Sequence, residues 1–207
     1  MIKFSCEKAL LQSAINVCSR AVAQKSSIPA LEGLLLHLDS QLTISGFNMQ
    51  TGIRTKVAAD ITAPGDIVLN ARLFGDIIRR MPDDVVTFTA DDKLLVRLQC
   101  GDADFEILGL SAKDYPELPE VEGDYGLFIQ QRYLRAMIEE TAFAVSTNES
   151  RPVHTGALFE ISAAGLTMVA EISKRAPGAS GAAGGRRLLL RLPRQRIEGG
   201  AEHLRRL

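Results

Sequence analysis

Three histidines are the residues of this chain that most readily support acid–base or metal chemistry, and they lie far apart in the sequence. His37, His154 and His203 have no serine or cysteine nucleophile motif near them, and a lone histidine is usually a surface or satisfied residue. A glycine-rich run at residues 177–185 lacks the strand, the closing Lys-Ser/Thr pair and the helix of a phosphate-binding loop. We therefore expect no catalytic residue, no cofactor and no metal.

The cysteines indicate neither a zinc site nor a disulfide framework. Cys6, Cys18 and Cys100 are odd in number and lack the C-x-x-C spacing of zinc sites. Free cysteine is among the most buried residue types, so we expect three reduced side chains in a core.

Charge and composition narrow the remaining classes of protein. The chain has 207 residues, 46% of them hydrophobic, which is enough to bury one full core and part of another. Its 24 Lys and Arg against 25 Asp and Glu give a net charge of −1, so any contact to nucleic acid must come from local placement of basic side chains. Because the sequence shows neither a basic leader before an apolar run nor an apolar stretch of roughly 20 residues, we expect a cytoplasmic protein with no membrane partner.

The chain repeats itself at a spacing of 123 residues, and the second copy is cut short. A period this long exceeds any solenoid unit and indicates two copies of a whole domain in tandem. The residues that match in register include Leu11 and Leu134, Ile15 and Ile138, Ser27 and Ser150, Pro29 and Pro152, Gly33 and Gly156, and Leu35 and Leu158.

Each copy must position its side chains on helices and short strands. Residues 8–22 place apolar side chains at i, i+3, i+4 and i+7, which predicts an amphipathic helix that recurs in the second copy. Asn70 is a candidate N-cap of a second helix, which Pro82 ends. Strands are predicted at residues 34–38, 41–45, 51–60, 85–90, 94–99 and 104–110. Helices and strands do not alternate as βαβ units, so the fold class is α+β with antiparallel sheets, and residues 111–125 form an interdomain linker.

Three stretches carry a resemblance to a known family. Residues 70–82 (NARLFGDIIRRMP), 109–119 (GLSAKDYPELP) and 149–160 (ESRPVHTGALFE) resemble the bacterial sliding clamp, the beta subunit of DNA polymerase III, and the similarity runs from Met1 to about Ala170. In that family each protomer has three copies of one domain with two helices each, and two protomers close a ring that tethers the polymerase to duplex DNA.

The resemblance implies a non-catalytic accessory subunit, a DNA replication processivity factor. Its implied partners are duplex DNA bound through the backbone, DNA polymerase III subunits, the clamp loader and a second protomer in a homodimer. Residues 1–120 would form clamp domain 1 and residues 121–173 part of clamp domain 2.

The resemblance also implies a charge layout, because a clamp that slides needs phosphate contacts without base contacts. Lys25 and Arg72 match basic DNA-contact positions of the family, and Asn148 matches a polar one. The other basic residues have only their place on predicted helices in favour of a DNA contact, and for them a solvated helix face is the alternative. These residues are Lys8, Arg20, Arg79, Arg80, Arg132 and Arg135.

Two apolar residues match the family's dimer contacts. Phe105 and Ile107 lie on the last predicted strand of the first copy. An alternating strand buries such residues in any soluble domain, so core packing is the alternative.

The similarity to the family ends after Ala170. Residues 174–207 are rich in Ala, Gly and Arg without usable periodicity, which is typical of a gene read in a shifted frame. We expect a frameshift near residues 174–178 and a non-native, disordered tail. The sequence thus predicts a truncated clamp that does not close a ring. The alternative is a stand-alone interaction module that binds full-length clamp or its loader through the dimer face of domain 1.

Overall fold

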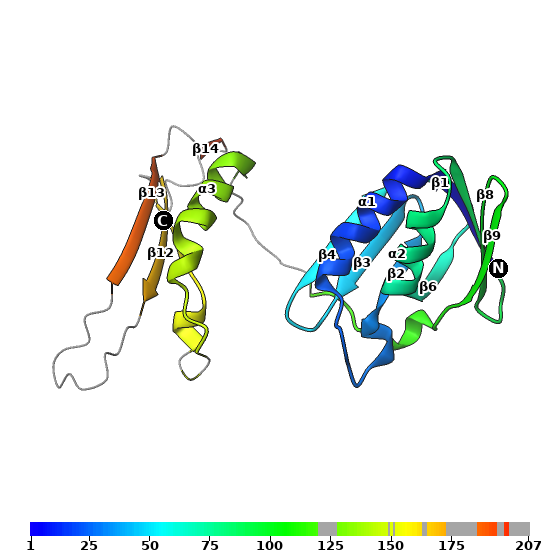
Figure 1. The fold of residues 1–207 in the computed structure, drawn as a ribbon, viewed down its shortest axis with the longest axis horizontal. Coiled ribbons are helices and arrows are strands. Elements are labelled where there is room, and N and C mark those ends of the chain that lie inside the picture. Colours follow the sequence, from blue (N-terminus) through cyan, green and yellow to red (C-terminus); the bar gives the residue numbers. More distant parts are fainter. Residues whose placement is uncertain are drawn as a thin grey trace. The chain divides into compact units, whose positions relative to one another are not determined.

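The computed structural model describes residues 1–119, 128–148, 150, 152–162, 165–172, 186–193 and 197–198, and from residue 171 onward only the backbone is described. The chain forms two compact units, Met1–Glu120 and Val121–Leu207, each of which is a separate body in Figure 1.

Two antiparallel sheets and two helices make up the first unit, as the α+β prediction requires. One sheet has the order β5-β1-β7-β8-β9, and the other has the order β4-β3-β2-β6. The elements are β1 (Ile2–Glu7), α1 (Lys8–Cys18), β2 (Gly33–Leu38), β3 (Leu42–Phe47), β4 (Gly52–Val57), β5 (Asp60–Ala63), β6 (Gly65–Asn70), α2 (Ala71–Arg80), β7 (Val85–Ala90), β8 (Leu95–Cys100) and β9 (Ala103–Leu108). Short 3-10 helices at Ser19–Ala21, Pro29–Glu32 and Ala112–Asp114 join them.

Both helices form where the apolar spacing predicts them. The buried stripe of α1 includes Leu11, Ile15 and Cys18, at the spacing that brings side chains to one face. Asn70 caps α2, because its Oδ1 accepts the Leu73 N–H at 3.0 Å. The helix ends at Arg80, two residues before a proline that cannot continue it.

One core joins the two sheets to the two helices. Phe4 of β1 and Phe88 of β7 stack with ring centroids 4.7 Å apart and are almost completely buried. The same cluster includes residues of β2, β3 and both helices. All three cysteines are free and buried, as predicted, and burial raises the pKa of the Cys6 thiol to about 12. In Figure 1, α1 and α2 lie side by side, and the two helices contact each other.

The prediction of one strand over residues 51–60 is wrong. The ladder with β3 ends where Val57 pairs with Leu42, and a second ladder begins where Asp60 pairs with Ser5 of the other sheet. The alternation of side chains continues across this change of sheet, so the sequence pattern does not reveal it. Strands β1 and β6 were not predicted at all.

The segment expected to be a linker from residue 111 packs on the first unit as far as Leu118. Tyr115 is buried, and its hydroxyl donates to the Ser45 carbonyl oxygen at 3.4 Å. Burial raises the pKa of Tyr115 to about 12. A buried aromatic ring with a partner for its hydroxyl belongs to a domain and not to a linker, so the predicted linker begins too early.

The second unit reproduces part of the first in the predicted register. Helix α3 (Gln131–Thr141) follows α1 by 123 residues, and β12 (Gly165–Ile172) begins 123 residues after β3. The other elements are β10 (Phe128–Ile129), β11 (Leu158–Ser162), β13 (Arg186–Pro193), β14 (Ile197–Glu198) and 3-10 helices at Ala142–Ala144 and Pro152–Thr155. Strands β11, β12 and β13 form one antiparallel sheet, and β10 pairs with β14.

The structure differs from the expected disorder of residues 174–207 at one strand in particular. Strand β13 pairs with β12 over its whole length, from Gly165 opposite Pro193 to Ile172 opposite Arg186. It takes the place beside β12 that β4 takes beside β3. The backbone of a leucine-rich segment gains hydrogen bonds when it pairs with an open strand edge. This holds whether or not the segment is native to the family.

Among the side chains that the structure describes, the second unit has a smaller buried cluster than the first. This cluster consists of Met137, Leu166 and Met168. All five residues of β11 are exposed. Within the described residues, this unit has no counterpart of α2 or of the five-stranded sheet, which agrees with an incomplete second domain. No helix in the described part of the chain is long and apolar enough to cross a membrane.

We predict that Phe88→Ala lowers the free energy of unfolding of the first unit by about 3–5 kcal/mol, because it removes a fully buried ring. Urea denaturation followed by circular dichroism measures the change. Val85→Ala is the matched control on the same strand, since Val85 is 49% exposed and its truncation should cost less than about 1 kcal/mol. Equal effects of the two substitutions would contradict the assigned core.

We predict that backbone amides of β13 exchange more slowly with solvent than those of an unstructured peptide, because β13 is paired with β12. Hydrogen exchange resolved along residues 186–193 measures this. Uniformly fast exchange there would show that the strand does not persist in solution.

Candidate nucleic-acid interface

An open groove of about 700 Å³ lies between α1 and the first turns of α2. Asn16 and Ser19 line it from α1 and the turn that follows, and Arg72, Asp76 and Arg79 line it from α2. The apolar stripes of both helices are buried against the sheets, so polar residues remain on the outer side. This is the surface on which the sequence predicts phosphate contacts.

Two predicted contact residues present free cations at this surface. Arg72 is exposed in the first turn of α2 and lines the groove. Lys25 is exposed in the loop that follows α1. Neither residue forms an ion pair with any residue that the structure describes. Their positive charges are therefore available to an anionic partner.

Lys8 is not such a residue, although it lies on α1. Its side chain is 10% exposed, and its Nζ lies 2.7 Å from Asp83 Oδ1. A lysine held in this way cannot reach a phosphate without breaking its ion pair, so its inclusion among the helical candidates is wrong.

Acidic neighbours on the same helix neutralise two further candidates. Arg79 pairs with Asp76 at 3.1 Å, and Arg135 pairs with Glu139 at 2.8 Å. Hydrogen bonding to Glu139 raises the pKa of Arg135. The i,i+3 and i,i+4 spacings could have shown both pairs from the sequence. Each pair reduces the net charge that its helix offers to DNA.

The remaining helical cations differ among themselves. Arg20 and Arg80 are exposed and form no ion pair within the described residues. Arg132 lies over the Tyr133 ring at 4.7 Å from the centroid and donates to its hydroxyl oxygen at 3.1 Å. Arg20 and Arg80 thus remain available, whereas Arg132 already has a partner.

Acidic residues limit the attraction of this surface for phosphate. Glu32 and Asp76 both line the groove beside Arg72. Glu32 Oε1 also accepts the Ser26 N–H at 3.1 Å, which holds the carboxylate near the loop that carries Lys25. A surface that mixes both signs of charge binds phosphate more weakly than a uniformly basic one.

Asn148, the predicted contact of the second unit, is exposed after the 3-10 helix that follows α3. Its Oδ1 accepts the Ser150 N–H at 3.0 Å. The side-chain amide nitrogen remains a donor that can face a phosphate oxygen.

The two predicted dimer residues behave differently. Phe105 is 38% exposed on β9, which is the edge strand of its sheet. Ile107 is only 9% exposed and belongs to the core of its own unit. Of these two residues, only Phe105 therefore presents substantial apolar surface to another chain.

Nothing in the described part of the chain resembles a metal centre, because no group of three or more His, Cys, Asp or Glu side chains converges there. His37 lies on the surface against Asp66. His203 and the glycine-rich run at 177–185 lie outside the described residues.

Solved structures place this fold in the class of DNA polymerase sliding clamps. A Bacillus subtilis sliding clamp matches 93% of this chain and 54% of its own, with a TM-score of 0.78 and 28% identity. A Streptococcus pyogenes DNA polymerase beta subunit matches 92% of this chain and 53% of its own, with a TM-score of 0.77 and 30% identity.

The sequence comparisons identify the family. The model of the DNA polymerase III beta subunit N-terminal domain matches residues 2–119, and the chain belongs to that family. Beta sliding clamps of Halalkalibacterium halodurans and Bacillus subtilis are each 31% identical to it, over 83% and 84% of this chain and 48% of their own lengths. The chain thus spans about half the length of the curated relatives it matches.

Proposed function

We propose that this chain is a DNA replication processivity factor of the sliding-clamp type, without catalytic activity of its own. Lys25 and Arg72 carry the proposal, because Arg72 is exposed on α2, Lys25 is exposed in the loop that follows α1, and neither has an acidic partner among the described residues. The fold and the family membership support it. Asn148 would add a neutral contact from the second unit.

The chemistry of this surface suits a protein that slides on duplex DNA. A few separate cations neutralise phosphates one at a time and carry no sequence information. Glu32 and Asp76 keep each contact weak, so the protein can move from one phosphate to the next. Tight binding has to come from encirclement and not from these contacts.

The partners of the intact family extend the proposal. Duplex DNA, DNA polymerase III subunits, the clamp loader and a second protomer would each be partners. The 207 residues contain one complete clamp domain and part of a second, so we propose that they do not close a homodimeric ring by themselves.

The proposal also includes a non-native origin for the tail, residues 174–207. The change to an Ala-, Gly- and Arg-rich composition supports a frameshift near residues 174–178, and sequencing the gene across the codons for residues 169–182 tests it.

We predict that the chain binds linear duplex DNA weakly, with a Kd near the ~10⁻⁴ M end of nonspecific binding, with a steep salt dependence and no sequence preference. Lys25→Glu/Arg72→Glu should abolish this binding, because it replaces two free cations by anions. Fluorescence anisotropy with a labelled linear duplex measures both.

A matched control reverses two charges elsewhere on the first unit. Arg54→Glu/Lys56→Glu changes the net charge equally on β4, where both side chains are exposed and alternate with core-facing residues. The control should retain more DNA binding than the helix-face variant. Submicromolar, salt-resistant binding by the unmodified chain, or equal losses in both variants, would contradict the proposed surface.

A second candidate function rests on β9. Phe105 is 38% exposed on a strand along whose outer side no described strand pairs, which favours an interaction module that binds a full-length clamp. We predict that, in this case, the chain captures the purified Bacillus subtilis relative in a pull-down and that Phe105→Ser weakens the capture. This function would be excluded if control resin without the chain retained as much of the relative as the chain captures. Equal capture by the Phe105→Ser variant would exclude it as well.

A further inference from the structure

Strand β11 of the second unit exposes apolar side chains on the face of its sheet that carries the buried cluster. Phe159 lies opposite Met168 of β12, so the two side chains share one face. Ile161 lies opposite Leu166 on the same face. Met168 and Leu166 are almost completely buried, but Phe159 is 44% exposed and Ile161 is 49% exposed. The buried cluster therefore covers β12 and leaves the same face of β11 open.

The internal repeat shows what covers the matching positions in the first unit. Leu36 of β2 lies 123 residues before Phe159 and is completely buried. Leu38 lies 123 residues before Ile161 and is 2% exposed. Strand β6 pairs with β2 and sets Ile67 opposite Leu36, and α2 follows β6 directly and contacts β2. In the first unit, one strand and the helix that follows it thus cover these positions.

Helix α3 is open at the position where α1 meets α2. Ile15 of α1 is 2% exposed, and a Cβ added to Gly75 of α2 would lie only 3.3 Å from Ile15 Cγ2. Ile138 of α3 lies 123 residues after Ile15 and is 42% exposed. We call Ile138, Phe159 and Ile161 the open face of the second unit. Each matches a buried residue of the first unit.

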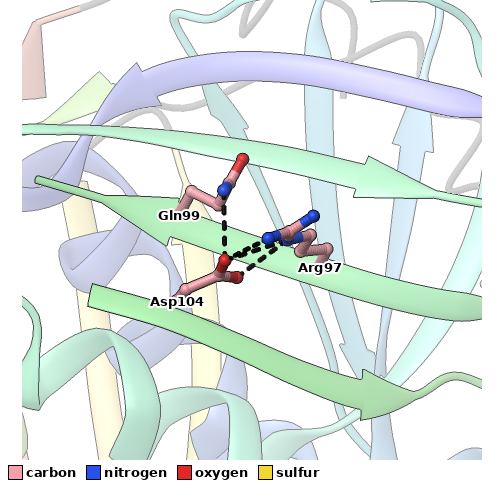
Figure 2. A network of polar contacts seen from close by, with 3 residues as sticks. All are labelled: Arg97, Gln99 and Asp104. Atoms are coloured by element: carbon pink, nitrogen blue, oxygen red, sulfur yellow. Dashed lines mark hydrogen bonds and ion pairs between the residues drawn. The ribbon is translucent and has the colours of Figure 1, made fainter. Parts of the chain in front are cut away.

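A sheet face that is directed at water carries polar side chains, as β8 and β9 of the first unit show. Figure 2 shows Arg97 and Gln99 of β8 converging on Asp104 of β9. Arg97 Nε donates to Asp104 Oδ1 at 2.9 Å, and Gln99 Nε2 donates to Asp104 Oδ2 at 3.2 Å. The open face of the second unit has three apolar side chains instead. Exposed apolar residues that gather on one face indicate a surface for contact with another segment.

We propose that the open face binds a strand and the helix that follows it, supplied by another polypeptide with the pattern of β6 and α2. The strand pairs antiparallel with β11 on the side away from β12, as β6 pairs with β2, and places an apolar residue opposite Phe159. The helix places a glycine or alanine against Ile138, as α2 places Gly75 against Ile15. This partner adds to the proposed function and does not use the surface of α1 and α2.

The test uses the full chain and a labelled peptide with the sequence of residues 65–82, in which Asp66→Lys is introduced. The exchange is made because Asp66 lies opposite His37, whose counterpart in the second unit is Glu160, and like charges opposite each other destabilise a strand pair. Fluorescence anisotropy should show saturable binding. Amides within residues 158–162 should gain protection from hydrogen exchange when the peptide binds.

A second peptide controls for the apolar pattern. It carries Ile67→Ser and Phe74→Ser in addition, which removes one apolar side chain from the strand and one from the helix. Both side chains are completely buried in the first unit. This peptide should bind at least about fivefold less tightly.

Substitutions on the two faces of β11 locate the contact. Phe159→Ser removes a ring from the open face and should weaken binding of the first peptide by about fivefold or more. Leu158→Ser removes an apolar side chain that is 55% exposed on the opposite face of the same strand. It should change the affinity by less than about twofold. Circular dichroism checks that both variants keep the secondary structure of the unmodified chain.

Absence of saturable binding, equal binding of the two peptides, or equal losses in the two variants would overturn the proposal. Protection at residues 33–38 in place of residues 158–162 would overturn it as well, because the peptide would then have displaced β6 from β2. DNA binding by Lys25 and Arg72 is measured separately, so failure of this proposal and failure of the proposed function are distinguishable.

Discussion

The shared core of the first unit is the constraint on which the rest of the structure depends. Two sheets and two helices bury their apolar faces against one another, with Phe4 stacked on Phe88 at the centre. Burying one face of α1 and α2 forces the opposite face outward, and the groove between the helices follows from their contact. The candidate interface is thus a by-product of core formation, and sequence variation on the outer face can adjust its charge without disturbing the fold.

Ion pairing within the protein decides which cations this outer face offers. Lys8 is committed to Asp83, and Arg79 is committed to Asp76. Lys25 and Arg72 remain free to contact an anionic partner because no described acid pairs with them. On β8, Arg97 is likewise committed to Asp104 of β9. Intramolecular ion pairs therefore leave only a few charged side chains free to contact a partner. The net charge of −1 consequently says little about what the chain binds.

Elements with local signals could be predicted from the sequence, and contacts that depend on distant residues could not. The stripe of α1, the Asn70 cap and the strand at Val85–Ala90 follow from local spacing. The separation of β4 from β5 depends on which sheet each strand joins, so alternation alone misses it. Lys8 and Asp83 are 75 residues apart, so their ion pair has no local signal. Strand β13 forms because β12 has an open edge, which composition does not show.

The exposure of β11 on both faces has a consequence for how the protein behaves as its concentration rises. All five of its residues are exposed, among them Leu158, Phe159 and Ile161, and the side away from β12 has no described strand paired to it. Short apolar strands with an open edge are templates on which further strands add one after another. Solubility of the chain is therefore governed by its smaller unit, and covering this one strand should do more to keep the protein in solution than strengthening the larger core.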